Sequence, residues 1–212
     1  VEGSADHYRN MIDYIEENGV ASDDDYEYIK TQMNVINFMD YEIAQIYCDN
    51  QDWPGNNIKF WKPQRENARW RWIIYDTDFG FGIGFGDYGS GYDVNTLRFA
   101  LEENGSSWPN PPWSTFLLRS LLENDNFKTE FINRFADRLN AEFREETVHF
   151  LIDSLAANIE HELPYHSQRW NNLWDFEYEV DYFHEFAEER PYYMRRFLRM
   201  EFSIGGSISN LS

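Results

Sequence analysis

The chain has 212 residues and a formal net charge of −20, and 42% of its residues are hydrophobic. This length can bury one sizeable core, whereas the acidity excludes nucleic-acid binding, which needs clustered Lys and Arg, and disfavours anionic membranes. The charge suits divalent cations or basic partners, although solubility alone would also explain it. Cys48 is the only cysteine, so no intramolecular disulfide can form. Within these 212 residues we expect neither a membrane-inserted segment nor a signal peptide, because no apolar run is long enough.

The first part of the sequence is predicted to form three helices. Apolar residues recur at helical spacing over residues 8–15, and Gly19 is a stop signal. Ser22 is the predicted N-cap of a second helix, whose acidic first turn suits the helix dipole. Asn34 is the predicted N-cap of a third helix, which has a continuous apolar face and ends at Asn50.

Two short strands are predicted next. Residues 53–57 are typical of a turn, and strands are expected at residues 58–61 and 69–75 because aromatic and β-branched residues dominate there. A polar connection that contains Pro63 joins the two strands. We expect them to pair as a hairpin that ends in the sequence Asp-Thr-Asp-Phe-Gly at residues 76–80.

The rest of the chain is predicted to be nearly all helical. The glycine-rich segment at residues 80–91 is expected to form a long loop, and Pro191 is the predicted first residue of the last helix. The expected fold is therefore α+β and predominantly α-helical. We expect one domain over residues 1–204, followed by a linker or tail at residues 205–212.

The strongest local signal for chemistry is a pair of carboxylates, Asp76 and Asp78, at the end of the second predicted strand. Extended residues i and i+2 point to the same side, so both side chains could face one ion. Hard cations such as Mg²⁺ prefer carboxylate oxygens. Asp-rich turns are also common as solvated caps, and spacing alone favours that interpretation.

A second signal lies upstream, where Asp52 and Asn57 have the spacing Asp-x-x-x-x-Asn. Protein kinases use this spacing in the catalytic loop, where the Asp accepts the proton of the substrate hydroxyl and the Asn holds a metal. A kinase strand pair then leads to a metal-binding Asp followed by Phe-Gly, and residues 78–80 have that sequence. Each signal alone is weak, but their order indicates a kinase-like site.

The residues around these motifs resemble the CotH family of atypical kinases. The similar segments are residues 52–57 (DWPGNN), 70–72 (WRW), 75–80 (YDTDFG), 95–97 (NTL), 121–124 (LLEN), 131–135 (FINRF) and 166–170 (HSQRW). CotH proteins are divergent protein kinases that use ATP and Mg²⁺ to phosphorylate protein substrates such as other spore-coat proteins. The resemblance therefore implies a helical domain like a kinase C-lobe, with a short hairpin that carries a site for Mg²⁺, Mn²⁺ or Ca²⁺. It also implies an extracellular, cell-surface or spore-coat location in a bacterium.

The resemblance assigns roles by motif. Asp52 matches the catalytic-loop aspartate, and Asn57 matches the asparagine that holds a metal. Asp76 matches the metal-binding aspartate of the family's Trp-Asp-x-Asp motif, although Tyr75 replaces the usual Trp. Asp78 is the alternative or second ligand, because the literal Asp-Phe-Gly match favours it whereas the family motif favours Asp76.

Two further features complete the kinase interpretation. Trp72 and Tyr75 are the candidate cofactor-binding residues for ATP. The glycine-rich run at residues 80–86 superficially resembles a phosphate-binding loop, but no Lys and Ser/Thr follow it, and it comes after the metal motif. We interpret this run as the counterpart of an activation segment.

A complete kinase also needs an N-terminal lobe with a β-sheet, a phosphate-binding Lys and its Glu partner. No segment before Asp52 is predicted to form such a sheet, so we expect that lobe to be missing from this chain. The chain alone should then bind metal weakly and have little or no kinase activity. Lys59, Lys62 and Arg69 are nearby cations, but such residues are more often exposed strand positions than phosphate ligands.

Two other functions remain open from the sequence. A non-catalytic surface or spore-coat assembly module would keep the acidic site for a structural Ca²⁺ ion. A glycosidase would use paired carboxylates in an aromatic cleft. Asp52 and Asp76 could supply that pair, whereas Asp76 and Asp78 are too close together in the sequence.

Overall fold

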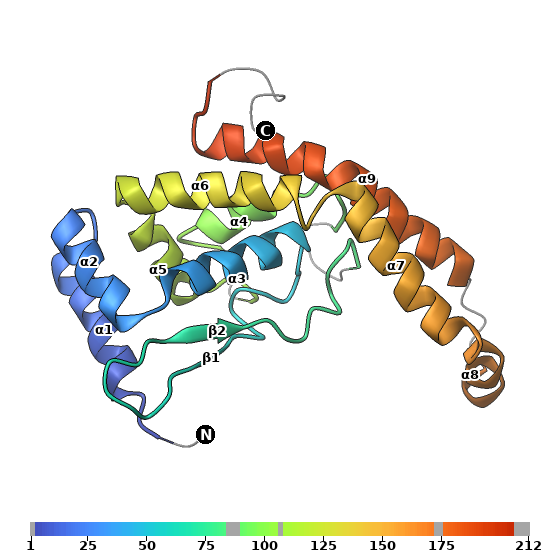
Figure 1. Ribbon diagram of the computed structural model, residues 1–212, viewed down its shortest axis with the longest axis horizontal. Coiled ribbons are helices and arrows are strands. Elements are labelled where there is room, and N and C mark those ends of the chain that lie inside the picture. The colour runs from blue at the N-terminus through green and yellow to red at the C-terminus, as the bar shows by residue number, and fades with distance from the viewer. Residues whose placement is uncertain (1–2, 84–89, 106–107, 172–175, 206–212) are drawn as a thin grey trace.

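The computed structural model describes residues 3–83, 90–105, 108–171 and 176–205, and within these ranges it is mainly helical with one two-stranded sheet (Figure 1). The helices are α1 (Asp6–Asn18), α2 (Asp23–Gln32), α3 (Val35–Tyr47), α4 (Thr96–Leu101), α5 (Pro112–Leu121), α6 (Asp125–Asn140), α7 (Glu145–Glu160), α8 (Leu163–Trp170) and α9 (Phe176–Glu201). The strands are β1 (Lys59–Trp61) and β2 (Arg71–Ile73). The predicted α+β fold, predominantly α-helical with a short hairpin, is confirmed.

Local capping explains where the first helices begin and end. The Ser22 side chain accepts a hydrogen bond from the Asp25 backbone N–H, and the Asn34 side chain accepts one from that of Asn37. Gly19 ends α1 with a φ of 73°, a conformation that glycine adopts without steric cost. These three predicted boundaries are confirmed, whereas the predicted end of the third helix at Asn50 is wrong, because α3 ends at Tyr47.

The β1–β2 hairpin is antiparallel, with Phe60 opposite Trp72. Its second strand is fixed to the junction between α2 and α3. Trp70 donates its backbone N–H to the Gln32 carbonyl oxygen and accepts from the Asn34 N–H at 2.8 Å. The Asn37 side chain then bonds the Trp72 backbone twice, accepting from its N–H at 2.6 Å and donating to its carbonyl oxygen at 3.2 Å. The hairpin is therefore held in register against α3.

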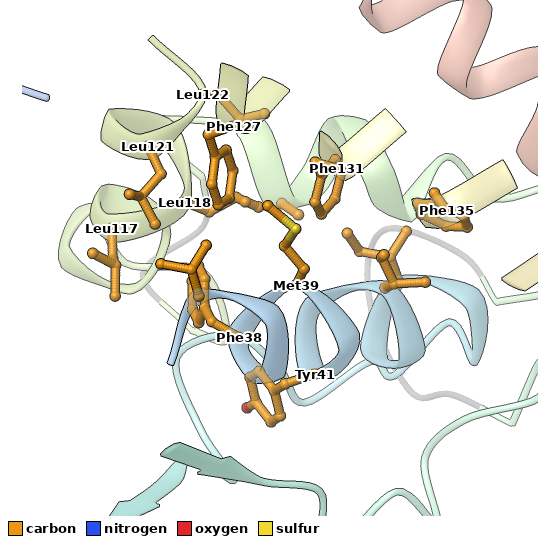
Figure 2. Packing of buried hydrophobic residues seen from close by; sticks show 14 of the residues in the cluster. Phe38, Met39, Tyr41, Leu117, Leu118, Leu121, Leu122, Phe127, Phe131 and Phe135 are labelled. Carbon is orange, nitrogen blue, oxygen red and sulfur yellow. The ribbon is translucent and has the colours of Figure 1, made fainter. Parts of the chain in front are cut away.

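Helix α3 forms the centre of the core. Nine of its thirteen residues are buried, because α6 lies on one side of it and the hairpin on the other (Figure 1). Met39 points towards Leu118, Phe127 and Phe131 of α5 and α6, whereas Tyr41 points towards the hairpin (Figure 2). Each large apolar side chain buried in this way contributes about 1.5–3 kcal/mol.

The C-terminal helices build an arm. Helix α7 packs along the first half of α9, away from the centre of the fold, and α8 lies at the far end of this pair (Figure 1). Val148 is the one buried residue of α7, all of which the structure describes. The arm is therefore held together mainly by contacts at the surface.

The prediction that Pro191 begins the last helix is wrong, because α9 runs continuously through Pro191. Proline in a helix interior removes one backbone hydrogen bond and tends to bend or break the helix. Buried residues lie on both sides of it, including Phe186, Ala187, Met194 and Leu198. Packing of this face against the core outweighs the lost hydrogen bond.

Two predicted segments lie partly outside the described residues. Residues 84–89 of the glycine-rich loop and residues 206–212 of the tail are outside the described part of the chain. In the part of the chain that is described, none of the helices combines the length and the apolar character needed to cross a lipid bilayer.

Arg190 of α9 is completely buried, and it joins segments that are far apart in the sequence. Its guanidinium donates hydrogen bonds of 2.7–3.0 Å to five oxygens: the backbone oxygens of Ile46, Tyr47, Tyr92 and Val94 and the hydroxyl of Thr96. Thr96 in turn donates its hydroxyl hydrogen to the buried carboxylate of Asp49 at 2.5 Å. Asp49 also accepts from the Gly91 backbone N–H at 3.1 Å. The end of α3, the segment before α4 and the middle of α9 are thereby joined.

We expect Arg190→Met to lower the free energy of unfolding by about 3 kcal/mol or more, because it leaves several buried carbonyl oxygens without a donor and removes the positive charge that favours the ionised form of Asp49. Urea denaturation followed by circular dichroism measures this change. Arg196 is an exposed residue on the same helix, so Arg196→Ala is the control and should stay within about 0.5 kcal/mol of the native chain. A loss below about 1 kcal/mol for Arg190→Met would contradict the role assigned to the guanidinium.

Candidate functional site

The loop at residues 49–57 connects α3 to β1 and carries the first predicted site residue, Asp52. The Asp52 side chain is buried, and its Oδ2 accepts hydrogen bonds from the side-chain amides of Asn57 at 2.8 Å and Asn56 at 3.2 Å. Its other oxygen, Oδ1, is also buried and has no hydrogen-bond partner among the described residues. This oxygen therefore has no internal partner, but a ligand can reach it only if the surrounding side chains move, because almost none of its surface is exposed.

Asn57 links the loop to the end of the hairpin. Its backbone is left-handed, with a φ of 54°, a conformation that Asn tolerates better than most residues. Its side-chain oxygen accepts from the Tyr75 hydroxyl at 3.2 Å, and its amide nitrogen lies 3.4 Å from the Asp76 carbonyl oxygen. The structure thus brings Asp52, Asn57, Tyr75 and Asp76 together from two separate segments.

Asp76 and Asp78 are both exposed and lie beside this loop. The pKa of Asp76 is raised, first by partial desolvation, then by a hydrogen bond with Asp78 and by the negative charges of Asp78 and Asp52. The two side chains meet because Asp76 has a left-handed backbone with a φ of 56°. The expectation that Asp76 and Asp78 lie on one side of an extended strand is therefore wrong, because the backbone at Asp76 is not extended. Three carboxylates therefore converge, and a cation would relieve their mutual repulsion.

Lys59 contributes a positive charge next to these carboxylates. Its ammonium nitrogen lies 3.5 Å from the centroid of the Tyr75 ring, a cation–π contact, and its charge opposes the rise in the pKa of Asp76. The sequence pattern favoured an exposed strand position for Lys59. The side chain is exposed, and its contacts also place it at the edge of the candidate site.

A cavity of about 720 Å³ adjoins Asn57 and Tyr75 and is lined by residues of the hairpin, α1, α3 and α5. We call it the hairpin cavity. Its walls are largely aromatic and include Tyr8, Phe60 and Trp72. Trp72 is buried and packs against Phe38 with ring centroids 4.7 Å apart, so it is part of the core as well as part of the cavity wall.

Glu42 of α3 also lines the hairpin cavity. Burial raises the pKa of its carboxyl group to about 8, because no nearby cation compensates for the loss of water around the charge. Glu42 therefore holds a proton at neutral pH. Glu42 is not among the site residues predicted from the sequence, although Phe38 and Ile46, one turn away on either side, indicate an apolar helix face at this position.

Gly55 holds the loop against the segment before α5. Its backbone N–H donates a hydrogen bond to the Pro109 carbonyl oxygen, and a Cβ atom at this position would collide with that same oxygen. The turn predicted at residues 53–57 therefore needs glycine here because another part of the backbone approaches closely.

The side chains gathered here suit a hard divalent cation such as Mg²⁺. Asn57, Asp76 and Asp78 offer amide and carboxylate oxygens, which such ions prefer. The buried Oδ1 of Asp52 without a partner is the second observation that fits a ligand at this position. On their own these carboxylates would repel a phosphate, so only a bound divalent cation would let the group neutralise one.

Comparison with known proteins gives one finding. The family model described as CotH kinase protein matches residues 1–194 of the chain. No curated protein and no solved structure shows significant similarity to the chain.

The raised pKa of Glu42 predicts how stability depends on pH. Between pH 4.5 and about 8, the folded chain keeps the Glu42 proton whereas the unfolded chain releases it, so the free energy of unfolding falls as the pH rises. Glu42→Gln removes this contribution. In the Glu42→Gln variant, the decrease in the free energy of unfolding between pH 5 and pH 8 should be smaller than in the native chain by as much as about 4 kcal/mol. Urea denaturation at pH 5, 6.5 and 8 measures the difference.

The control for this series is Glu17→Gln, at an exposed position on α1, which should show the same pH dependence as the native chain. An unchanged pH dependence in Glu42→Gln would show that the Glu42 carboxyl is not kept neutral by burial.

Proposed function

Because the chain belongs to the CotH kinase family, we propose that it is an atypical protein kinase module. Within the complete gene product, this module would transfer the γ-phosphoryl group of ATP to a Ser or Thr hydroxyl of a protein substrate, with Mg²⁺ or Mn²⁺ as the metal, whereas the 212-residue chain alone should have little or no activity. The observation that carries the proposal is the contact of the Asn57 amide with both the Asp52 carboxylate and the Asp76 backbone. This contact joins the two motifs whose order in the sequence resembles a kinase.

Asp52 is the proposed proton acceptor. Its Oδ2 is held by the amides of Asn56 and Asn57, whereas its buried Oδ1 has no partner. Oδ1 would accept a hydrogen bond from the substrate hydroxyl once substrate binding moves the side chains that cover it. As the hydroxyl oxygen forms its bond to the γ-phosphorus, the bond between that phosphorus and the oxygen of the departing ADP breaks. The hydroxyl proton passes to Asp52.

Asn57, Asp76 and Asp78 are the proposed metal ligands. A bound divalent cation would neutralise phosphate charge as the transfer proceeds. The Tyr75 hydroxyl holds the side-chain oxygen of Asn57, and the ring of Tyr75 carries Lys59 on its face. We therefore propose that Tyr75 keeps the metal ligands in place and contacts the nucleotide. Trp72 is buried, so it can contact the nucleotide only through the hairpin cavity.

The proposed substrate is a surface or spore-coat protein, since the family is associated with the bacterial spore coat. An acidic chain with a net charge of −20 favours a substrate that carries positive charge near its acceptor residue.

Phosphoryl transfer tests this proposal. Both the 212-residue chain and the complete gene product are incubated with radiolabelled ATP, Mg²⁺ or Mn²⁺ and surface-protein extracts. We expect Asp52→Ala and Asp76→Ala to lower labelling on the order of 10²-fold or more, because each removes a group that acts in the transition state. Asp181→Ala is the matched control, because Asp181 is exposed on α9.

Labelling that is equal in the native protein and in Asp52→Ala would contradict the proposal, and so would the absence of labelling from both the chain and the complete gene product. In that case, thermal stabilisation by Ca²⁺ without any effect of ATP would indicate the alternative function, a non-catalytic assembly module with a structural cation.

A further inference from the structure

The seam between α7 and α9 in the arm carries a second group of ionisable side chains, which the proposed kinase site does not use. Glu145, His149 and Asp153 follow one another at intervals of four residues on α7, so they share one helix face. His184 and Glu188 have the same interval on α9. Two histidines and three carboxylates therefore face one another across two packed helices.

The contacts within this seam are close. His149 Nε2 lies 3.8 Å from Glu188 Oε1 and 3.2 Å from the His184 carbonyl oxygen. His184 Nε2 lies 3.0 Å from Asp153 Oδ1, and the two imidazole rings are 4.4 Å apart at an interplanar angle of 86°. One potential ligand atom from each of Glu145, His149 and Glu188 lies within 4.8 Å of the other two.

These separations can be compared with those around a metal ion. Tetrahedral Zn²⁺ with ligand bonds near 2.1 Å holds its ligand atoms about 3.4 Å apart. The observed ligand atoms, which lie within 4.8 Å of one another, are therefore at most about 1.4 Å farther apart than in a closed site. Glu145 is exposed, and the Glu188 side chain is 53% exposed, so both can rotate inwards without disturbing the core.

We propose that Glu145, His149 and Glu188 form a binding site for Zn²⁺ that connects α7 to α9. An imidazole with two carboxylates is a ligand set that suits Zn²⁺ and related transition metals and that Mg²⁺ does not prefer. A water molecule completes the tetrahedron. This site includes an imidazole nitrogen, whereas the candidate kinase site at Asp76 and Asp78 offers only oxygen ligands. The proposed Zn²⁺ site does not depend on the proposed kinase activity.

The hydrogen bonds around the cluster change in a defined way when the ion binds. Coordination through His149 Nε2 requires the hydrogen to be on Nδ1, so the contact of Nε2 with the His184 carbonyl oxygen is exchanged for the bond to the metal. The pairing of His184 with Asp153 keeps the second imidazole beside the ion without making it a ligand. Because α7 buries little apolar surface, a bond through the metal would add substantially to its attachment.

Zn²⁺ titration by calorimetry tests the site, using the tag-free native chain in excess Mg²⁺ so that oxygen-only sites are occupied. We expect one Zn²⁺ site per chain. His149→Ala should weaken its affinity at least about tenfold, and Glu188→Gln should weaken it in the same direction. His161→Ala is the matched control, since His161 lies at the end of α7 with its side chain 69% exposed and outside the cluster. Asp76→Asn should also leave the affinity unchanged.

Co²⁺ absorption provides an independent measurement, because tetrahedral Co²⁺ with an imidazole ligand gives visible bands that Zn²⁺ removes. Glu188→Gln keeps the proposal testable if His149→Ala fails to fold by circular dichroism. The proposal is overturned if the native chain shows no saturable Zn²⁺ binding in excess Mg²⁺. It is equally overturned if His149→Ala and Glu188→Gln both bind Zn²⁺ as tightly as the native chain.

Discussion

The buried guanidinium of Arg190 is the interaction on which the candidate site depends. A buried charge is costly unless every donor finds a partner, and here the partners are five oxygens from the end of α3 and from residues 92–96. The hydroxyl of Thr96 extends the network to the carboxylate of Asp49. The network therefore fixes the start of the loop that carries Asp52. It also fixes residues 92–96, which follow Asp76 and Asp78 in the chain.

The hairpin fixes the other end of the same loop. Backbone bonds from Trp70 and Trp72 to the α2–α3 junction hold β2 against α3, and the chain leaves β2 directly into Tyr75 and Asp76. Asn57 then meets these residues from the opposite side. The geometry of the site thus results from two anchors on one central helix, which explains why residues separated by about twenty positions in the sequence converge without a larger sheet.

Features set by local chemistry were predictable from the sequence. The caps at Ser22 and Asn34 and the hairpin depend on neighbouring residues, so their patterns identified them. The protonated Glu42, the buried Arg190 and the passage of α9 through Pro191 depend on packing between distant elements. The motifs nominated Asp52, Asn57, Asp76 and Asp78 by their order, whereas the partner-free Oδ1 of Asp52 needed the three-dimensional fold.

The left-handed backbone at Asn57 and Asp76 limits which residues can replace them during evolution. Among residues other than glycine, Asn and Asp accept this conformation most readily, and they are also the residues that supply oxygen ligands. A relative without the proposed kinase activity would still be under pressure to retain them for conformational reasons. Asp52 is not among the left-handed residues of the described chain, so its replacement in a relative would be the more informative sign of a pseudoenzyme.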